Sequence, residues 1–310
     1  MTLTQLNYLL SVAEHGNFTA AAQKSFVTQP TLSMQIQKLE EELEVKIFNR
    51  STKPIGLTTI GRTIVAQAKI ILQEAQRMED AVAQEKGVVA GTFRLGIIPT
   101  VMPTLLPMFL TNFINKYTKV DLKIEELTTE NIVERLNNGQ LDAGIAATPL
   151  NDATIIEKPL FYEPFVAFLP NNHPLTKEKQ IEVEELQHND ILVLEDGHCF
   201  RNHVLNLCQA NKSPKKFGLK SGSFETLINL ANQGLGMTLL PYLHTLDLNA
   251  KQKEQLKNFP EPAPAREISL IHSKNQLKLP VIEALRNTIT GVVRGAIKFD
   301  NFKIIEPRIV

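Results

Sequence analysis

The 310-residue chain contains no tryptophan, only two cysteines and no net charge, because 33 lysines and arginines balance 33 aspartates and glutamates. Two cysteines exclude the disulfide framework of a small secreted protein. The first residues lack a basic segment followed by an apolar one, so no signal peptide is expected. The most apolar stretch, 97–110, is interrupted by three prolines and is too short to span a bilayer. We therefore expect a cytoplasmic protein that makes no membrane contact.

The composition is otherwise that of an ordinary globular protein, with 43% hydrophobic and 21% charged residues. At about 100–200 residues per domain, the length predicts two or three domains. Zero net charge excludes a protein that is basic throughout, but it allows a basic surface on one domain. The distribution of charge along the chain is therefore more informative than its sum.

The first 43 residues show three helical patterns. Leucines at helical spacing predict a first helix that Gly16 ends, and a second is expected near 18–25. Thr28 can cap a third helix, whose first turn tolerates Pro30. A stripe on this third helix is expected to face a core, and it consists of Leu32, Ile36, Leu39 and Leu43.

Acidic residues are absent around the start of the third helix and from the segment after it. Residues 17–39 contain no carboxylate, and 45–73 contain none either. The second segment instead carries Lys46, Arg50, Lys53, Arg62 and Lys69. Residues 50–58 have the pattern of a short two-stranded wing, which commonly contacts DNA phosphates or the minor groove. A solvated amphipathic helix would explain the third helix alone, but the combination favours a winged helix-turn-helix.

The run FTAAAQKSFVTQPTLSMQIQKLEEELEVKIFNRS, followed by LTTIGR, resembles the DNA-binding domain of LysR-type transcriptional regulators over residues 1–90. The resemblance implies double-stranded promoter DNA and RNA polymerase as partners. It also implies that Gln29, Pro30, Thr31 and Ser33 approach the bases, and that Arg50 contacts the DNA backbone or minor groove. The expected DNA-binding residues are Gln29, Pro30, Thr31, Ser33, Lys38, Arg50 and Lys53.

Apolar residues between positions 59 and 85 are separated alternately by four and three residues. They are Ile64, Ala68, Ile71, Ala75, Met78 and Val82. This seam of about three heptads predicts a dimeric coiled coil, although a helix packed on its own domain is the alternative. A dimer would present two recognition helices to half-sites about one DNA turn apart. Residues 87–91 contain two glycines and are expected to end the helix.

From residue 92 onward, strand and helix patterns alternate, which predicts α/β subdomains with mainly parallel sheets. Strands are expected at 93–98, 122–127, 143–147, 165–169, 191–194, 237–240 and 268–271, and helices near 103–117, 131–138, 224–233 and 280–297. Thr100 and Thr129 follow the first two strands. Because ligands bind at the carboxyl ends of parallel strands, both could face one cleft. Taken alone, each threonine is better interpreted as a helix N-cap.

The resemblance to LysR-type regulators extends to this half and implies the two-lobed fold of periplasmic binding proteins (type II). The expected fold is thus an N-terminal all-α winged helix-turn-helix with a long dimerisation helix, followed by an α/β regulatory domain. Its boundaries are 1–58 for the DNA-binding domain, 59–86 for the coiled-coil linker helix, 87–91 for a hinge and 92–310 for the regulatory domain. Lobe I would hold about 92–162 and 266–310, and lobe II about 163–265.

Both cysteines lie in the run LEDGHCFRNHVLNLCQAN. His198 and Arg201 flank Cys199, and a nearby cation favours the reactive thiolate. Cys208 follows two leucines and is expected to be buried or half-buried. If the intervening segment is helical, it rises about 13 Å, whereas a disulfide needs Cα atoms within roughly 7 Å. A pair that bonds only after unwinding is a candidate redox switch, with a sulfenic acid at Cys199 captured by Cys208.

Three other interpretations compete at this point. Two unrelated buried cysteines are common in cytosolic proteins. A metal site made of His198, Cys199, His203 and Cys208 has irregular spacing, and Arg201 would repel the cation. A two-cysteine peroxidase shares the chemistry but needs no DNA-binding domain. Since no phosphate-binding glycine loop, nucleophile elbow or zinc-protease helix occurs, we expect no enzyme, no cofactor and no metal.

The motif GHC-x-R with a second cysteine nine residues on resembles the peroxide-sensing LysR-type regulators. The segments IIPTVMPTLLP, SFETLINLANQGLGMTLLP and PAPAREISL share the resemblance. It implies that hydrogen peroxide oxidises Cys199, that Cys208 resolves the product as a disulfide, and that a thiol reductant such as glutaredoxin or thioredoxin reverses it. The residues it implies for positioning the peroxide are Thr100, Thr129, His198, Arg201 and Arg266.

The same resemblance implies a dimer or tetramer whose rearrangement activates oxidative-stress genes. Asn202 and His203 depart from the pattern, since such sensors often carry an acid at the first position. Taken alone, Arg266 would be interpreted as part of a surface ion pair. The alternative within the family is a regulator that answers a small organic effector in the cleft between the lobes.

Overall fold

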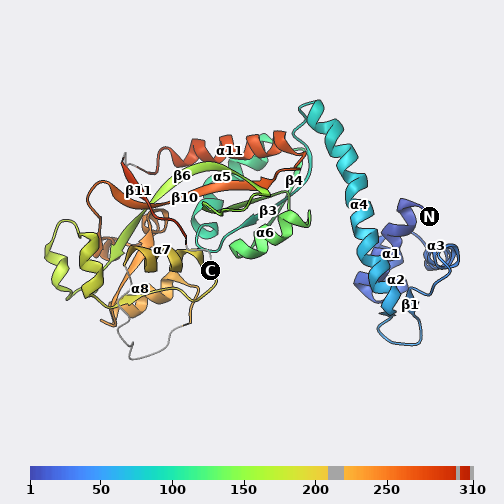
Figure 1. The fold of residues 1–310 in the computed structure, drawn as a ribbon, viewed down its shortest axis with the longest axis horizontal. Coiled ribbons are helices and arrows are strands. Elements are labelled where there is room, and N and C mark those ends of the chain that lie inside the picture. Colours follow the sequence, from blue (N-terminus) through green and yellow to red (C-terminus); the bar gives the residue numbers. More distant parts are fainter. Residues whose placement is uncertain (209–219, 298–300, 308–310) are drawn as a thin grey trace. The chain divides into compact units, whose positions relative to one another are not determined.

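The computed structural model describes residues 1–208, 220–297 and 301–307, and its chain divides into two compact units, 1–85 and 86–310 (Figure 1). Each unit has its own hydrophobic core, and the second unit has two. None of the helices within the described ranges is long and apolar enough to cross a membrane. The units are described separately below.

The first unit begins with three helices: α1 (Leu3–His15), α2 (Phe18–Lys24) and α3 (Gln29–Glu42). The hydroxyls of Thr2 and Thr28 cap α1 and α3, and Gly16 ends α1 with a left-handed φ of 58°. These local signals were readable from the sequence, and the helices occur where they predict. The expectation for Leu43 was wrong: α3 ends at Glu42, so Leu43 becomes its C-cap and stays 38% exposed.

The wing consists of β1 (Phe48–Asn49) and β2 (Gly56–Leu57), which pair antiparallel. Glu40 on α3 is buried and accepts hydrogen bonds from the backbone N–H groups of Ile47, at 2.7 Å, and Phe48, at 3.2 Å. A charged acceptor makes these bonds stronger than ordinary amide bonds. One carboxylate therefore fixes the wing against the helix that precedes it.

Helix α4 (Thr59–Glu85) follows the wing. Its first turns pack on the unit's own core, where Val65 and Ala68 are buried. Further along, Ile71, Met78 and Val82 are 37%, 74% and 54% exposed. The interpretation of a helix packed on its own domain is thus correct for the start of α4. Ala75 is half-buried, and these three other residues of the heptad seam lie exposed on the single chain.

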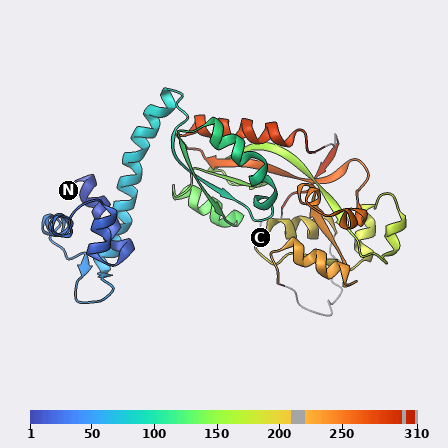
Figure 2. The same cartoon turned by 180° about the vertical axis from the view of Figure 1, so that it is seen from behind.

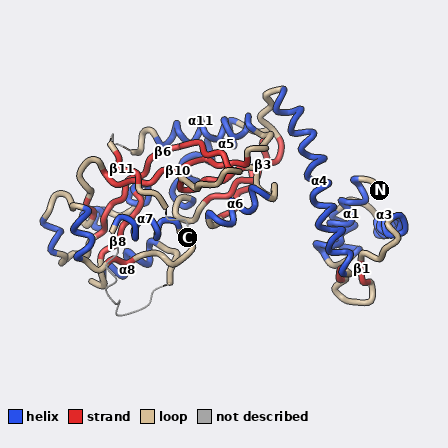
Figure 3. Tube along the Cα trace, in the orientation of Figure 1, coloured by secondary structure: helices blue, strands red, loops and turns tan. Residues whose placement is uncertain are grey.

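The second unit is built on a curled mixed sheet in the order β4-β3-β5-β10-β6-β8-β7, with β11 beside β10 and β9 beside β6 (Figure 3). Its strands are β3 (Gly91–Ile97), β4 (Val120–Glu126), β5 (Ala143–Thr148), β6 (Ile155–Phe168), β7 (Ile191–Leu192), β8 (Met237–Pro241), β9 (Leu256–Lys257), β10 (Ala263–Ser273) and β11 (Phe302–Ile304). Parallel pairs join β3 to β4 and β5, β7 to β8 and β10 to β11. The prediction of mainly parallel sheets was wrong for the middle, where β6 and β10 run antiparallel to each other.

The two long central strands carry the chain from one core to the other and back, which is why they run in opposite directions. The helices are α5 (Met102–Lys116), α6 (Thr129–Asn137), α7 (Cys199–Leu207), α8 (Phe224–Asn232), α9 (Tyr242–Leu246), α10 (Ala250–Glu254) and α11 (Leu279–Val293), with 3₁₀ turns at Pro174–Lys177 and Val183–His188. Helices α5 and α11 lie side by side on the first core, called lobe I here (Figure 1 and Figure 2). Helices α7 and α8 belong to the second, called lobe II.

Candidate functional site

Both cysteines lie at the ends of one helix. Cys199 is the first residue of α7, and Cys208 caps its C-terminus by donating its backbone N–H to the Val204 carbonyl at 2.9 Å. Both thiols are free. Because the intervening residues are α-helical, the two Cα atoms are separated by a rise of about 13 Å. A disulfide between them therefore requires α7 to unwind.

A narrow cleft surrounds the Cys199 thiol. It is lined by Ile98, Pro99, Thr100, Thr128, Thr129, Gly197, His198 and Cys199. These residues come from the end of β3, the start of α6 and the loop before α7. The cleft leaves no room for a water molecule as the side chains stand. Entry of even a very small molecule requires a side-chain or loop movement.

Thr100 and Thr129 thus line one cleft, and neither is a helix cap. The cap of α6 is Thr128, whose hydroxyl accepts the N–H of Asn131, and α5 starts after Val101. The Thr100 hydroxyl instead accepts a hydrogen bond from Arg266 at 2.9 Å. The N-cap alternative is therefore wrong for both threonines.

Arg266 lies on β10 with no exposed surface, so its interpretation as part of a surface ion pair is wrong. Its Nε and Nη2 donate to Oε2 of Glu163 at 3.0 and 2.7 Å. Its Nη2 also donates to the Thr100 carbonyl at 3.1 Å, and its guanidinium lies 5.0 Å from the centroid of the Phe200 ring. A buried, fully oriented cation therefore borders the cleft.

Two buried polar atoms that line the cleft have no hydrogen-bond partner among the residues that the structure describes. They are Oγ1 of Thr129 and Nδ1 of His198. Leaving such atoms unpaired costs about 1–3 kcal/mol each. The His198 ring reaches this position because residue 222 is glycine: a Cβ there would lie 2.6 Å from its Nε2. The cleft is thus suited to a small molecule that both donates and accepts hydrogen bonds.

The two thiols differ in their electrostatic surroundings. Burial raises the pKa of Cys199, but the charge of Arg266 acts in the opposite direction. Burial alone raises the pKa of Cys208 to about 12. Since the thiolate is the nucleophile, only Cys199 has, among the described residues, a neighbouring charge that favours the reactive form. The asymmetry identifies Cys199 as the better candidate for attack on a substrate.

Arg201 is not brought to the thiol, although it is two residues away in sequence. Its Nη1 donates to the Leu194 carbonyl at 2.9 Å, and its Nε pairs with Oδ1 of Asp196 at 2.9 Å. The cation that acts on Cys199 is Arg266, 67 residues further along the chain. Arg201 fixes the loop that carries His198.

His203 is completely buried one turn after Cys199. Its Nδ1 lies 2.8 Å from the Cys199 carbonyl oxygen and must donate to it, since a carbonyl only accepts. Its Nε2 has no partner within the described ranges. Burial and the charge of Arg266 lower its pKa to about 3, so the ring is neutral. No three metal-binding side chains gather anywhere in the described part of the chain.

The residues expected at DNA lie on α3 and the wing. Gln29, Pro30, Thr31 and Lys38 are exposed and Ser33 is half-buried. Lys53 is exposed between the two wing strands. Arg50 is also exposed, but its Nη2 lies 3.4 Å from Oε2 of Glu40 and its guanidinium stacks on Phe18 at 5.1 Å.

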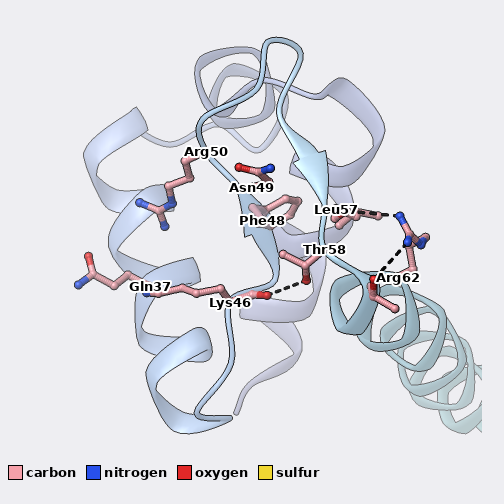
Figure 4. Close-up of a pocket in the computed structure, with 9 residues that line it drawn as sticks. Gln37, Lys46, Phe48, Asn49, Arg50, Leu57, Thr58 and Arg62 are labelled. Carbon is pink, nitrogen blue, oxygen red and sulfur yellow. Dashed lines mark hydrogen bonds between the residues drawn. The ribbon is translucent and has the colours of Figure 1, made fainter.

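A hollow between α3, the wing and the start of α4 adds further basic groups (Figure 4). Its lining includes Gln37, Lys46, Arg50, Thr59 and Arg62. Lys46 and Arg50 lie on one side and Arg62 on the other (Figure 4). Lys46 and Arg62 lie in the stretch 45–73, which contains basic residues and no acidic ones, yet neither was among the expected DNA contacts. Their spacing around one hollow is suited to a phosphate backbone.

Family models cover both units. The model described as a bacterial regulatory helix-turn-helix protein, lysR family, matches residues 3–62, and the LysR substrate binding domain matches residues 86–294. The chain belongs to the LysR family. As in other LysR regulators, the first unit is the DNA-binding domain and the second has the fold of periplasmic binding proteins.

Similar LysR proteins include the hydrogen peroxide-inducible genes activator of Pectobacterium carotovorum, which is 32% identical over 95% of this chain and 98% of its own. The DNA-binding transcriptional dual regulator OxyR of Escherichia coli K12 is also 32% identical, over 88% of this chain and 89% of its own. Among solved structures, full-length OxyR from Pseudomonas aeruginosa with a cysteine replaced by aspartate is 34% identical. It superposes with a TM-score of 0.70 and covers 94% of this chain and 98% of that one.

A peroxide-bound cysteine mutant of OxyR from Corynebacterium glutamicum is 27% identical, with a TM-score of 0.66, and covers 95% of this chain and 93% of that one. The matches span nearly the full length of both chains. The similarity to these proteins therefore covers both units of the chain, and not merely one domain.

Arg62→Ala is expected to weaken binding of this LysR protein to DNA by a similar factor for every sequence. It is also expected to reduce the slope of log K against log salt by about one, because one phosphate contact is lost. Fluorescence anisotropy with its own promoter and a scrambled fragment, at several salt concentrations, measures both quantities. Arg77→Ala, on the same helix but paired with Glu74, is the control that should change neither. A loss confined to the promoter fragment would contradict a phosphate contact.

Proposed function

We propose that this LysR regulator is a cytoplasmic redox sensor. Hydrogen peroxide oxidises Cys199, a disulfide forms with Cys208, and the resulting change in DNA binding activates oxidative-stress genes. The observation that carries the proposal is the pairing of a tight cleft around Cys199, lined by unpartnered polar atoms, with a second cysteine at the far end of the same helix. The names of the full-length relatives support the same function.

The chemistry balances in two steps. The Cys199 thiolate attacks one peroxide oxygen, the O–O bond breaks, and the departing hydroxide takes up a proton to leave as water. The Cys208 thiolate then attacks the sulfenic sulfur, and a second water leaves as the S–S bond forms. Thr100, Thr129, His198 and Arg266 are proposed to position the peroxide and stabilise the charged states. Arg201 contributes indirectly by holding the loop at residues 194–198.

The oligomer and the partners belong to the same proposal. Ile71, Met78 and Val82 form an exposed apolar seam on α4, which supports a dimer through this helix. Unwinding of α7 would then rearrange the dimer or a tetramer, and alter contacts with promoter DNA and RNA polymerase. A thiol reductant such as glutaredoxin or thioredoxin would restore the two thiols.

Two alternatives are less well supported. The cleft at Cys199 leaves no room even for water, so an organic effector would require a larger opening of the cleft than peroxide does. A thiol peroxidase needs rapid resolution in every cycle, whereas burial raises the pKa of Cys208 to about 12 and α7 must first unwind. Slow resolution is suited to a sensor that reacts once and keeps its state.

Treatment of the reduced protein with stoichiometric peroxide is expected to join Cys199 and Cys208. Mass spectrometry of a digest under non-reducing conditions should find the two peptides linked, with a loss of two hydrogens. In Cys208→Ser, a sulfenic acid at Cys199 should instead be trapped by dimedone. Unmodified peptides in the wild-type protein would exclude the sensor and favour the effector hypothesis. Rapid peroxide consumption with thioredoxin or glutaredoxin would favour the peroxidase.

A further inference from the structure

Arg266 uses most of its hydrogen-bonding capacity on two residues. A guanidinium has five N–H donors. Glu163 accepts from Nε and Nη2, and Thr100 accepts from Nη2 through its carbonyl and from Nη1 through its hydroxyl. One N–H on Nη1 therefore has no protein partner among the described residues. It lies on the same nitrogen that donates to Thr100, a residue that lines the cleft.

Glu163 is held as firmly as the arginine that it binds. It lies on β6, is 2% exposed, and its Oε1 accepts the backbone N–H of Leu243 at 3.0 Å. Its Oε2 accepts both bonds from Arg266. Each carboxylate oxygen thus has a buried donor, which fixes the rotamer of Glu163 and through it the plane of the guanidinium.

The pair also determines how strongly Arg266 acts on the thiol. An isolated buried cation stabilises a nearby thiolate strongly, because the low-dielectric interior screens charges poorly. A cation paired with a carboxylate presents a dipole, whose field falls off faster with distance. Burial remains the largest influence on Cys199 and outweighs the favourable contribution of Arg266.

Other charged groups near the thiol do not replace this pair. His203 on α7 is neutral, with its pKa lowered to about 3. Arg201 and Asp196 pair with each other, and His198 lines the cleft from the loop before α7. Thr129 on α6 and Thr100 after β3 carry no charge. The electrostatic effect on the Cys199 thiol therefore comes from Arg266, whose charge is partly neutralised by Glu163.

We infer that Glu163 is a positioning residue for the sensor thiol: it orients Arg266 against Thr100 and, by neutralising much of its charge, limits the stabilisation of the Cys199 thiolate. Glu163 thereby keeps the resting thiol less reactive than the buried arginine alone would make it. The link to peroxide rests on the proposed function, but the reactivity of Cys199 can be measured without peroxide.

Glu163→Gln in the full-length Cys208→Ser protein tests this inference through the pH dependence of Cys199 alkylation by iodoacetamide. Removing the carboxylate leaves Arg266 unneutralised, so the midpoint should move down by about one pH unit. Alkylation at neutral pH should rise by up to about tenfold. Glu157→Gln is the matched control, since Glu157 lies on the same strand and accepts the backbone N–H of Leu150, but is not bonded to Arg266. It should leave the midpoint unchanged.

A midpoint that stays or rises in a folded Glu163→Gln protein would overturn the inference. Because an unpaired buried arginine is costly, that variant can fail to fold. Glu163→Asp then serves instead. It keeps the negative charge but moves the carboxylate away from Arg266 by the length of one methylene, so the alkylation midpoint is expected to move down by a smaller amount. An unchanged midpoint there would equally overturn the inference. If wild-type protein forms no disulfide with peroxide, the proposed function fails, whatever the midpoints show.

Discussion

Replacing Cys199 with serine is expected to abolish peroxide-dependent disulfide formation and the peroxide-dependent change in DNA binding, while DNA affinity in the reduced state should stay within about twofold of wild type. The loss is complete because serine has no thiolate to attack the O–O bond. Cys208 cannot substitute, since burial raises its pKa to about 12. The DNA-binding unit is separate from the unit that carries Cys199, so the reduced variant retains its helix-turn-helix. Footprints of reduced and peroxide-treated protein on its own promoter measure both properties.

The matched variant is Cys208→Ser, which leaves the attacking thiol intact. It should still be oxidised at Cys199 but should form no intramolecular disulfide, so α7 has no covalent bond to keep it unwound. A Cys199→Ser protein whose footprint still changed on peroxide treatment would show that another residue is the sensor. If the footprint of Cys208→Ser changed as in wild type, sulfenic acid formation alone would be sufficient for the response.

The DNA-binding unit could be predicted closely because its signals are local. Thr2, Gly16 and Thr28 determine helix ends through contacts within four residues, and the core stripe of α3 repeats at helical spacing. Leu43 was misplaced because periodicity does not show where a helix ends. The left-handed φ of 55° at Glu44, one residue after the C-cap, turns the chain away from the axis of α3.

The second unit was less predictable because its central strands are defined by pairing over long separations. The first half of β6 contains Glu157, Lys158 and Pro159, and it pairs with β10 more than 100 residues away. Neither feature gives a strand pattern in a single sequence. The same separation concealed the contact between Glu163 and Arg266.

The sequence resemblance implied two arginines at the site, and the structure places them differently. Arg201 was expected to act on Cys199 because it is two residues away, yet its guanidinium is bound to Leu194 and Asp196. Arg266, which the resemblance also implied, is the cation whose charge lowers the pKa of Cys199, and it lies on β10. His198 was expected at the site, but the small residue that admits its ring, Gly222, carried no local signal.

Acidification from pH 7 to pH 5 is expected to destabilise the reduced protein through His203 by about 2 kcal/mol. The folded state lowers the pKa of His203 from 6.5 to about 3, so the unfolded chain binds the extra proton between these values. The stabilisation is therefore complete above pH 6.5 and is lost as the pH falls from 6.5 toward 3. Protonation would bury a second cation near Arg266, and the described residues offer Nε2 no acceptor.

Comparison of His203→Gln with wild type isolates this effect. Glutamine can donate to the Cys199 carbonyl but does not titrate, so the variant should lose about 2 kcal/mol less than wild type between pH 7 and pH 5 in denaturant unfolding. His244 and His272, whose pKa values burial also lowers, remain in both proteins and cancel in the difference. His188→Gln changes an exposed histidine and should keep the wild-type dependence. Equal losses in His203→Gln and wild type would show that His203 does not couple acid to stability. The bond from His203 to Cys199 spans the first turn of α7, so the protection of that turn from hydrogen exchange, relative to the intrinsic rate at each pH, should fall with acid in wild type alone.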